Sequence, residues 1–293
     1  MIQFKYTLDK SSKKFVCPTC GKRTFVRYIN TEVGLYLADE FGRCDRETNC
    51  GYHNHKPSSG EDKSTFRIIN IPKPKPSFHS LELVEKSFLN FYQNNFVAFL
   101  QTLFDSVEVK EAVNKYLIAT SKHYPGATIF WQIDNLERIH AGKILQYNLE
   151  TGKRVKDLEG KSLINWVHSV SKLKDFNLKQ CLFGLHLIKE RNTNTITIVE
   201  AEKTAVVMSL FKPEYTWLST GSKHGFKYEM LLPIKQYKII AFPDKSEFND
   251  WHKKANELNN QGFNISVSDF IENTNYPTGT DLADVYIDLK KHN

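Results

Sequence analysis

Four of the five cysteines lie close together near the N-terminus, in two pairs that suit a metal ion. Cys17 and Cys20 belong to a Cys-Pro-Thr-Cys-Gly segment, and the second pair, Cys44 and Cys50, also ends in Cys-Gly. The 23 residues between the pairs, 21–43, suffice for a β-hairpin that brings four thiolates around one ion. We therefore predict a tetrahedral zinc ribbon. The zinc would be structural, because four thiolates leave no open position for a catalytic water. Four free thiols are the alternative.

Basic and aromatic side chains surround the predicted zinc site. His53 and His55 follow the second pair and could replace a cysteine as ligands, although a surface position suits them better. A positively charged face with aromatic rings is typical of proteins that bind single-stranded nucleic acid. We expect the ribbon to bind single-stranded DNA through Arg27, Arg43 and Arg46, with a protein-docking face as the alternative.

Five carboxylates in the C-terminal third have the spacing of a second metal site. They are Glu200, Asp244, Glu247, Asp281 and Asp284. Glu200 directly follows one apolar run, Asp244 and Glu247 follow another, and the last two stand near the C-terminus. Carboxylates gathered in one place repel each other unless a divalent cation lies between them, and Mg²⁺ prefers such oxygen ligands. We predict a magnesium site, although Glu247 alone could be a charge at a helix N-terminus.

Apolar runs and helical periodicity alternate in the part of the chain that must position these acids. We predict strands at residues 195–199, 215–218, 237–242 and 264–267, and helices at residues 202–210 and 248–261. Such alternation predicts a mostly parallel sheet flanked by helices. Ligands of these sheets bind beyond the carboxyl ends of the strands, where the acids stand.

Composition shifts divide the chain into four parts. The ribbon occupies residues 1–57, and a Pro- and Lys-rich linker follows at 58–78, where alternating prolines keep the chain extended. The middle segment, residues 79–175, is first helical and then β-rich. Residues 176–293 hold the predicted parallel sheet. Within the middle segment we expect strands at residues 128–133 and 143–148.

Charge and hydropathy limit where the protein works. The 293 residues are 40% hydrophobic and carry a formal charge of +7, which permits a polyanionic partner without requiring one. We find no signal-peptide pattern and no apolar run of about 18 residues, so we expect a cytoplasmic protein that does not enter membranes. Clustered cysteines in a reducing compartment bind metal more often than they form disulfides. The isolated Cys181 is expected in the core.

The acidic segments resemble a known family. Residues 199–205, Val-Glu-Ala-Glu-Lys-Thr-Ala, resemble the strand-Glu-helix motif of Toprim domains, the fold shared by bacterial primases, topoisomerases and some nucleases. Residues 242–246 stand where that family has Asp-x-Asp, with Ser246 in place of the second aspartate. Asp281 with Asp284 resembles the terminal acidic motif. A cysteine knuckle ahead of such a domain resembles replicative primases, and the whole chain resembles Toprim proteins with zinc ribbons that accompany mobile elements.

The resemblance implies an α/β chain. Its parts are an N-terminal four-cysteine zinc β-ribbon, a primase-core-like middle segment and a C-terminal Toprim-like Rossmannoid parallel sheet with flanking helices. It also implies template-dependent phosphoryl (nucleotidyl) transfer with Mg²⁺, in which Glu200 is the general acid or base and Asp244 helps to hold the ion. The hydroxyl of Ser246 is a weaker magnesium ligand than a carboxylate. The alternatives are therefore a non-catalytic DNA-binding protein with a degenerate Toprim site, or a Toprim nuclease.

The same resemblance implies a basic path for a nucleic-acid backbone. Its side chains are Arg138, Lys143, Arg154, Lys203 and Lys223, for which a solvated face is the alternative. The sequence contains no Gly-rich loop of the Gly-Lys-Ser/Thr kind, so we expect any unwinding to come from a separate helicase. The sequence does not distinguish DNA from RNA as the partner, and it gives neither the template preference nor the oligomeric state.

Overall fold

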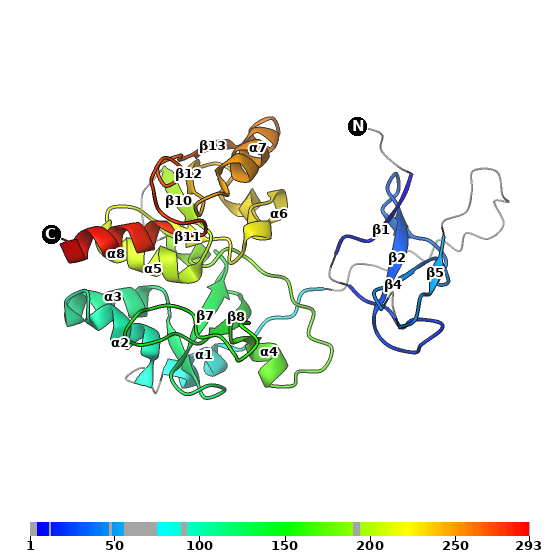
Figure 1. Ribbon diagram of the computed structural model, residues 1–293, viewed down its shortest axis with the longest axis horizontal. Helices are drawn as coiled ribbons and strands as arrows, with labels where there is room; N and C mark the ends of the chain where they lie inside the picture. Colours follow the sequence, from blue (N-terminus) through cyan, green and yellow to red (C-terminus); the bar gives the residue numbers. More distant parts are fainter. Residues whose placement is uncertain are drawn as a thin grey trace. The chain divides into compact units, whose positions relative to one another are not determined.

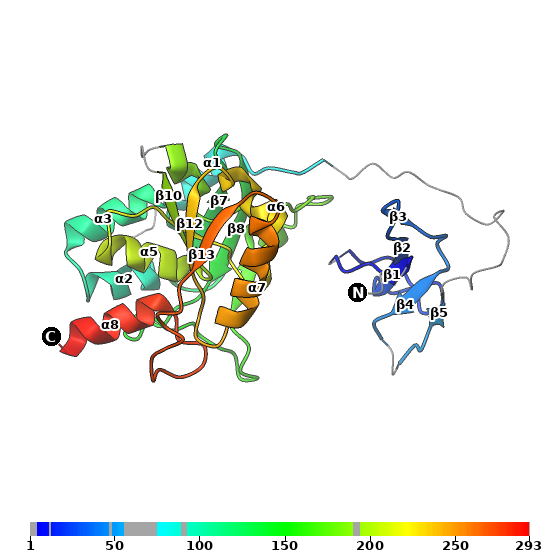
Figure 2. The ribbon, with the colours of Figure 1, turned by 90° about the horizontal axis from the view of Figure 1, so that it is seen from above.

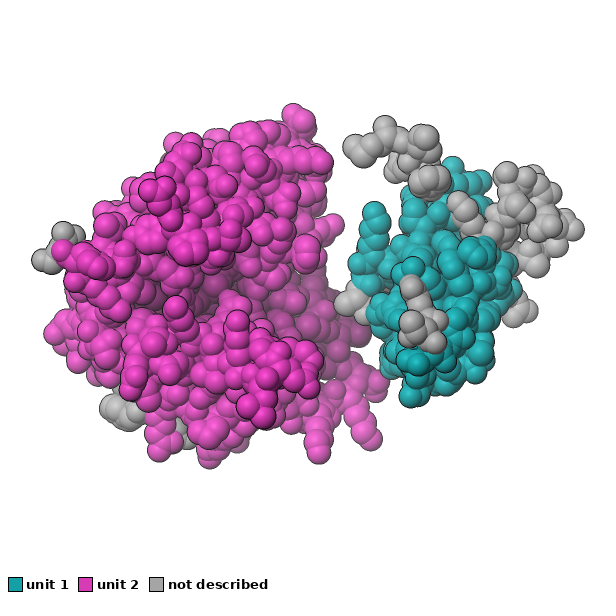
Figure 3. All heavy atoms as spheres, in the orientation of Figure 1, with its two compact units in different colours: residues 1–74 teal, residues 75–293 magenta. Residues whose placement is uncertain are grey.

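The computed structural model describes residues 5–11, 13–46, 49–55, 75–88, 93–189 and 194–292. The chain divides into two units, Met1–Pro74 and Lys75–Asn293, which Figure 3 draws in different colours. Most of the predicted linker, its residues 58–74, lies outside the described residues. Within the described ranges, no helix is long and apolar enough to cross a membrane.

The first unit is an antiparallel β-ribbon. Its strands are β1 (Tyr6–Leu8), β2 (Phe25–Asn30), β3 (Leu35–Tyr36), β4 (Gly42–Cys44) and β5 (His53–Asn54). They are ordered β1-β2-β4-β5, with β3 paired to β2. Cys17, Phe25 and Cys44 form the small core. A Cβ at Gly42 would lie 2.2 Å from the carbonyl oxygen of Val26, so only glycine lets β4 pass this close to β2.

The second unit begins with helices that pack on an antiparallel sheet. The helices are α1 (Leu81–Ser87), α2 (Asn95–Gln101) and α3 (Ser106–Lys115), and α4 (Val167–Val170) follows later. The sheet has the order β6 (Ala119–Ser121), β7 (Ala127–Ile133), β8 (Ile139–Leu145) and β9 (Ile164–Trp166). The side chain of Asn94 accepts hydrogen bonds from the backbone N–H groups of Phe96 and Val97, which fixes where α2 begins.

The rest of the second unit is a four-stranded parallel sheet in the order β11-β10-β12-β13. Its strands are β10 (Thr195–Val199), β11 (Trp217–Ser219), β12 (Lys238–Phe242) and β13 (Asn264–Val267). Its helices are α5 (Glu202–Phe211), α6 (Tyr228–Leu231), α7 (Phe248–Asn259) and α8 (Leu282–His292). Short 3-10 turns are η3 (Leu185–Lys189), η4 (Lys223–Gly225) and η5 (Leu232–Ile234). The predicted α/β class, with an N-terminal four-cysteine ribbon and a C-terminal parallel sheet, is confirmed (Figure 1).

Strand β10 is buried on both faces, and all five residues of its Thr-Ile-Thr-Ile-Val sequence are β-branched, which suits a buried strand. Ile196 and Ile198 pack in a cluster with residues of α6 and α7, whereas Val199 packs in a cluster with residues of α5 and α8. Figure 2 shows α5 and α8 on one side of the parallel sheet and α7 on the other. Cys181 is 8% exposed in the α6 and α7 cluster, so its predicted core position is confirmed.

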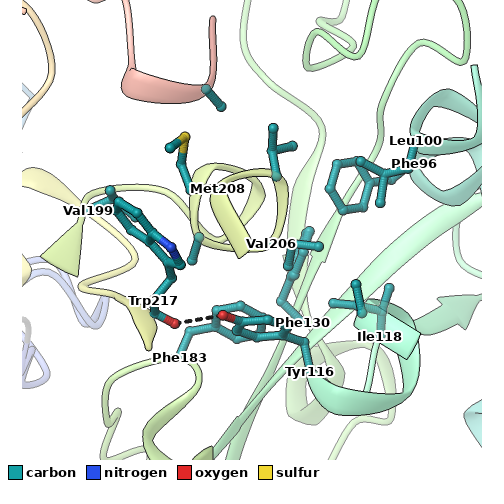
Figure 4. Packing of buried hydrophobic residues seen from close by; sticks show 14 of the residues in the cluster. Phe96, Leu100, Tyr116, Ile118, Phe130, Phe183, Val199, Val206, Met208 and Trp217 are labelled. Atoms are coloured by element: carbon teal, nitrogen blue, oxygen red, sulfur yellow. Dashed lines mark hydrogen bonds between the residues drawn. The ribbon is translucent and has the colours of Figure 1, made fainter. Parts of the chain in front are cut away.

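The two sheets of the second unit share a hydrophobic core. One cluster contains Phe96 and Phe130 from the first part of the unit together with Val206 and Trp217 from the second (Figure 4). The hydroxyl of Tyr116 donates a hydrogen bond of 2.9 Å to the backbone carbonyl of Trp217. The antiparallel sheet is therefore a packing partner of the parallel sheet, and its side chains can reach the acidic site.

Candidate functional site

The four cysteines form one metal-binding group. All four Sγ atoms lie within 4.8 Å of one another, with Cys17 and Cys50 at 3.7 Å and Cys20 and Cys44 at 4.0 Å. Thiolates about 2.3 Å from a central zinc in a tetrahedron are about 3.8 Å apart, so the geometry fits this ion. The predicted structural zinc site is supported at each of its four residues.

Two histidines lie outside this group. Among the described residues, the four cysteines are the one set of three or more such side chains that is gathered tightly enough for a metal ion, and neither histidine belongs to it. His53 instead hydrogen-bonds the hydroxyl of Tyr28 at 3.0 Å, and its ring contacts that of His55 at 3.9 Å between centroids.

The three arginines that we predicted to bind DNA differ in exposure. Arg27 is 6% exposed and pairs with Asp39 at 2.6 Å, so it serves the ribbon's own structure. Arg43 and Arg46 are half-buried and stay candidates for contact with nucleic acid.

Glu200 and Asp244 meet at the same edge of the parallel sheet. Val199 pairs with Phe242 in the register of β10 and β12, so Glu200 and Asp244 leave the sheet side by side. Burial, and then the charges of Asp281, Glu200 and Asp284, raise the pKa of Asp244 to about 8. The charge of Glu247 in turn acts on Glu200, so all five predicted magnesium ligands are linked by repulsion. Within the described part of the chain, however, no three carboxylates are gathered as tightly as the cysteines.

A lysine already compensates two of these acids. The Nζ of Lys203 lies 2.9 Å from Asp284 and 3.4 Å from Asp281. Although burial opposes it, the two carboxylates raise the pKa of Lys203 above its usual range. Lys203, which we predicted to contact nucleic acid, therefore acts as an internal counter-ion of the acidic site.

Lys143 crosses from the antiparallel sheet to the parallel one. Its Nζ lies 3.0 and 3.1 Å from the two carboxylate oxygens of Glu202 and donates to the carbonyl of Gly221 at 2.7 Å. Glu202 is fully buried and Lys143 is 6% exposed. Lys143 was also predicted on the nucleic-acid path, but the structure buries it in an ion pair that fixes the start of α5 against β8.

Lys223 forms an ion pair with Glu247, the fifth predicted magnesium ligand. Its Nζ lies 2.5 Å from Glu247 and 3.1 Å from Asp250, while its backbone N–H donates to the carboxylate of Glu200. Glu247 is the N-cap residue of α7, as its alternative interpretation held.

The remaining predicted basic residues have different surroundings. Arg138 pairs with Asp134 at 2.7 Å. Arg154 is exposed, and its charge interacts with Tyr147, Glu202 and Asp281 beside the acidic site. Arg154 is therefore the residue of the predicted basic path that faces both the acids and solvent.

Ser246 is turned into the neighbouring loop. Its backbone has a φ of +79°, its N–H donates to Glu272 at 2.8 Å, and its hydroxyl lies 3.2 Å from that of Thr278. The Nζ of Lys245 donates to the backbone carbonyls of Glu272 and Thr274. Ser246, which stands where the Asp-x-Asp pattern has its second aspartate, therefore binds the loop at 272–278. Of the five predicted magnesium ligands, Glu200 and Asp244 form no ion pair with a lysine in the described part of the chain.

The fold and these sites define a zinc-ribbon protein with an α/β unit that gathers carboxylates at the strand ends of a parallel sheet. The chain belongs to the family described as domain of unknown function (DUF6371), whose model matches residues 94–245. That range runs from the N-cap of α2 to just past Asp244, and so contains Lys143, Glu200 and Glu202. A second family model, a zinc beta-ribbon finger, matches residues 4–65. No curated protein sequence matches the chain.

Several solved structures are similar at low identity. The primase fragment of the bacteriophage T7 primase-helicase protein is 17% identical with a TM-score of 0.42, over 95% of this chain and 96% of that one. The RNA polymerase domain of Mycobacterium tuberculosis primase DnaG is 14% identical with a TM-score of 0.39, over 68% of this chain and 65% of that one. A DNA primase domain from Pseudomonas aeruginosa is 15% identical with a TM-score of 0.36, over 67% and 59%. These values are too low to assign a function.

Proposed function

We propose that this chain is a primase-like enzyme that joins nucleotides on a single-stranded DNA template, with magnesium at the acidic site. The main support is the placement of Glu200 and Asp244 at the carboxyl ends of two hydrogen-bonded parallel strands. This is the edge at which open parallel sheets bind their ligands. The zinc ribbon of the same chain offers half-buried arginines and aromatic rings for a strand.

The chain's own residues suit proton transfer and phosphate binding. Burial, and then the charge of Glu247, raise the pKa of Glu200, so this group retains a proton to higher pH than an ordinary glutamate. A carboxyl group of this kind can exchange a proton with a reacting hydroxyl. Glu200 and Asp244 would hold magnesium, which neutralises charge on the phosphate under attack. The repulsion that raises the pKa of Asp244 is what a cation would relieve, and the exposed Arg154 can pair with phosphate.

A second candidate function is DNA binding without catalysis. It is favoured by the ion pairs of Lys203, which take up Asp281 and Asp284, and by Ser246 at the second position of the Asp-x-Asp. These features leave fewer free carboxylates for metal than the Toprim pattern provides.

A magnesium-dependent synthesis assay separates the candidates. Purified protein is incubated with single-stranded DNA and labelled nucleotides, beside Glu200→Gln and the exposed control variant Glu214→Gln. Short labelled products that disappear in Glu200→Gln and persist in the control would support the enzyme. No product, with salt-sensitive DNA binding intact, would support the binding protein. Cleavage of DNA with magnesium but without nucleotides would show a nuclease. All three proteins must remain folded at the assay temperature for these comparisons.

The Toprim resemblance extends the proposal to the setting of the protein. We place it in the cytoplasm, in the replication of a mobile element, with a separate helicase to open the duplex. Co-purification of helicase activity with the tagged chain from its host would test this partnership, and its absence at low salt would count against it.

A further inference from the structure

Lys203 is a largely buried cation inside the acidic site. It is the second residue of α5, whereas Asp281 directly precedes α8 and Asp284 lies in the first turn of that helix. The side chain of Lys203 is 12% exposed and that of Asp281 is 11% exposed. Buried charges of this kind persist when they are paired, so the contact of Lys203 with its two aspartates is a fixed part of the folded site.

The two aspartates that hold Lys203 also act on the predicted magnesium ligands. Burial, and then the charges of these aspartates and of Glu200, raise the pKa of Asp244, whereas the charge of Arg154 lowers it. The aspartates are therefore within electrostatic range of the place where Glu200 and Asp244 would hold an ion. Lys203 compensates negative charge in the same part of the site as that ion would.

The charges of the site balance with a single divalent ion. Asp244 and the three acids that act on it carry four negative charges when ionised, whereas Lys203 and Arg154 carry two positive ones. One divalent ion makes this group neutral, and a second ion would leave two positive charges in excess. Glu202 and Glu247 do not alter the balance, because each pairs with a lysine of its own. The charge of the site therefore suits one ion.

We propose that the ammonium of Lys203 stands in for a divalent ion between its two aspartates and leaves the acidic site one ion, held by Glu200 and Asp244. An ammonium is a compact point charge with three donors, and it offers no coordination position to a substrate. Ser246 fits this assignment, because it brings no carboxylate for a further ion and its hydroxyl lies in the neighbouring loop. The inference rests on the proposed magnesium site and does not require nucleotide synthesis.

The test counts divalent ions with Mn²⁺, which takes the same oxygen ligands as Mg²⁺. Electron paramagnetic resonance measures the free Mn²⁺ in a titration of the full chain, with zinc in the ribbon and without nucleotide. Lys203→Met and Lys203→Gln remove the charge, and Lys203→Arg keeps it. Lys253→Met removes one charge at an exposed position of α7 as the control. The triple variant Lys203→Met/Asp281→Asn/Asp284→Asn removes the two acids as well.

We expect one bound ion per chain in wild type, in Lys203→Arg and in the control, and two in both neutral variants of Lys203. The triple variant should return to one ion, which would locate the added ion at the two aspartates. If the neutral variants do not fold, the count in wild type decides, because it needs no variant.

Three results would overturn the proposal: two ions in wild type, an equal count in wild type and a folded neutral variant, or a second ion that persists in the triple variant. An equal count of one would leave the magnesium site of the proposed function intact. No ion in wild type would contradict that site and this inference together. The expected counts without nucleotide synthesis would contradict the enzyme alone.

Discussion

Replacing Asp244 with asparagine should stabilise the second unit at high pH and have little effect at low pH. The folded state raises the pKa of this carboxyl from 3.8 to about 8. Between these values the folded protein binds more protons than the unfolded chain, so the free energy of unfolding falls as the pH rises from about 4 to about 8. Asparagine has no charge to lose, and the variant should escape this fall.

The size of the effect follows from the two pKa values. A difference of about four pKa units, at about 1.4 kcal/mol per unit, gives roughly 6 kcal/mol. Asp244 is only half-buried, so solvent screens part of the repulsion and we expect about 3 kcal/mol. For a unit of this size that free energy corresponds to a rise in melting temperature of about 6 to 12 °C at pH 8.5. Magnesium should raise the melting temperature of wild type at this pH and that of the variant much less.

Thermal unfolding by circular dichroism between pH 5 and pH 9 measures the difference between the two proteins. The pKa of His79 is lowered by burial to about 4, which destabilises both proteins as the pH falls below about 6.5 and cancels in the difference. Asp269→Asn, in an exposed turn, is the matched control and should show no such pH-dependent gain. A stability difference that is constant across this pH range, or an Asp244→Asn variant less stable at pH 8.5, would refute the reasoning.

Three further changes test the other charged and metal sites. Cys17→Ser should release zinc and unfold the ribbon, and an unchanged zinc content of the purified chain would contradict the assignment. Lys143→Met should cost about 3 to 5 kcal/mol in urea unfolding, because it leaves Glu202 charged and unpaired in the core. Adding Glu202→Leu should recover most of that loss. Lys203→Met should leave its two aspartates uncompensated, so magnesium should raise the melting temperature of this variant more than that of wild type. An equal rise would mean that the lysine does not compensate them.

Local sequence predicted the parallel sheet well and the antiparallel sheet less precisely. β10 occupies the predicted residues because all five of them are β-branched, which favours a strand. β8 begins at Ile139, whereas we predicted a strand at 143–148. The missed first half of β8 contains His140, whose polar side chain interrupts the apolar pattern. Asp134 pairs with His140 at 2.8 Å, and Glu202 pairs with Lys143 from 59 residues away, so partners outside the strand make their burial possible.

The helix α8 was missed, although its signal is present in the sequence. The Oδ1 of Asp281 accepts a hydrogen bond of 2.8 Å from the backbone N–H of Asp284, as at a helix N-terminus. Leu282 and Val285 then recur at helical spacing toward the core. We interpreted the two aspartates as metal ligands only. The pairing of Lys203 with both of them could not be predicted, because it depends on how α5 and α8 pack.

The hydrogen bond from Tyr116 to Trp217 has a consequence for how the second unit unfolds. It lies in a cluster to which both sheets contribute, so neither sheet can expose its apolar face without exposing that of the other. Backbone amides of β7 and β11 should therefore exchange with deuterium through the same global opening event. A shortened chain that carries the parallel sheet alone would present this apolar surface to water and aggregate. Each sheet thus covers apolar surface of the other and keeps it out of water.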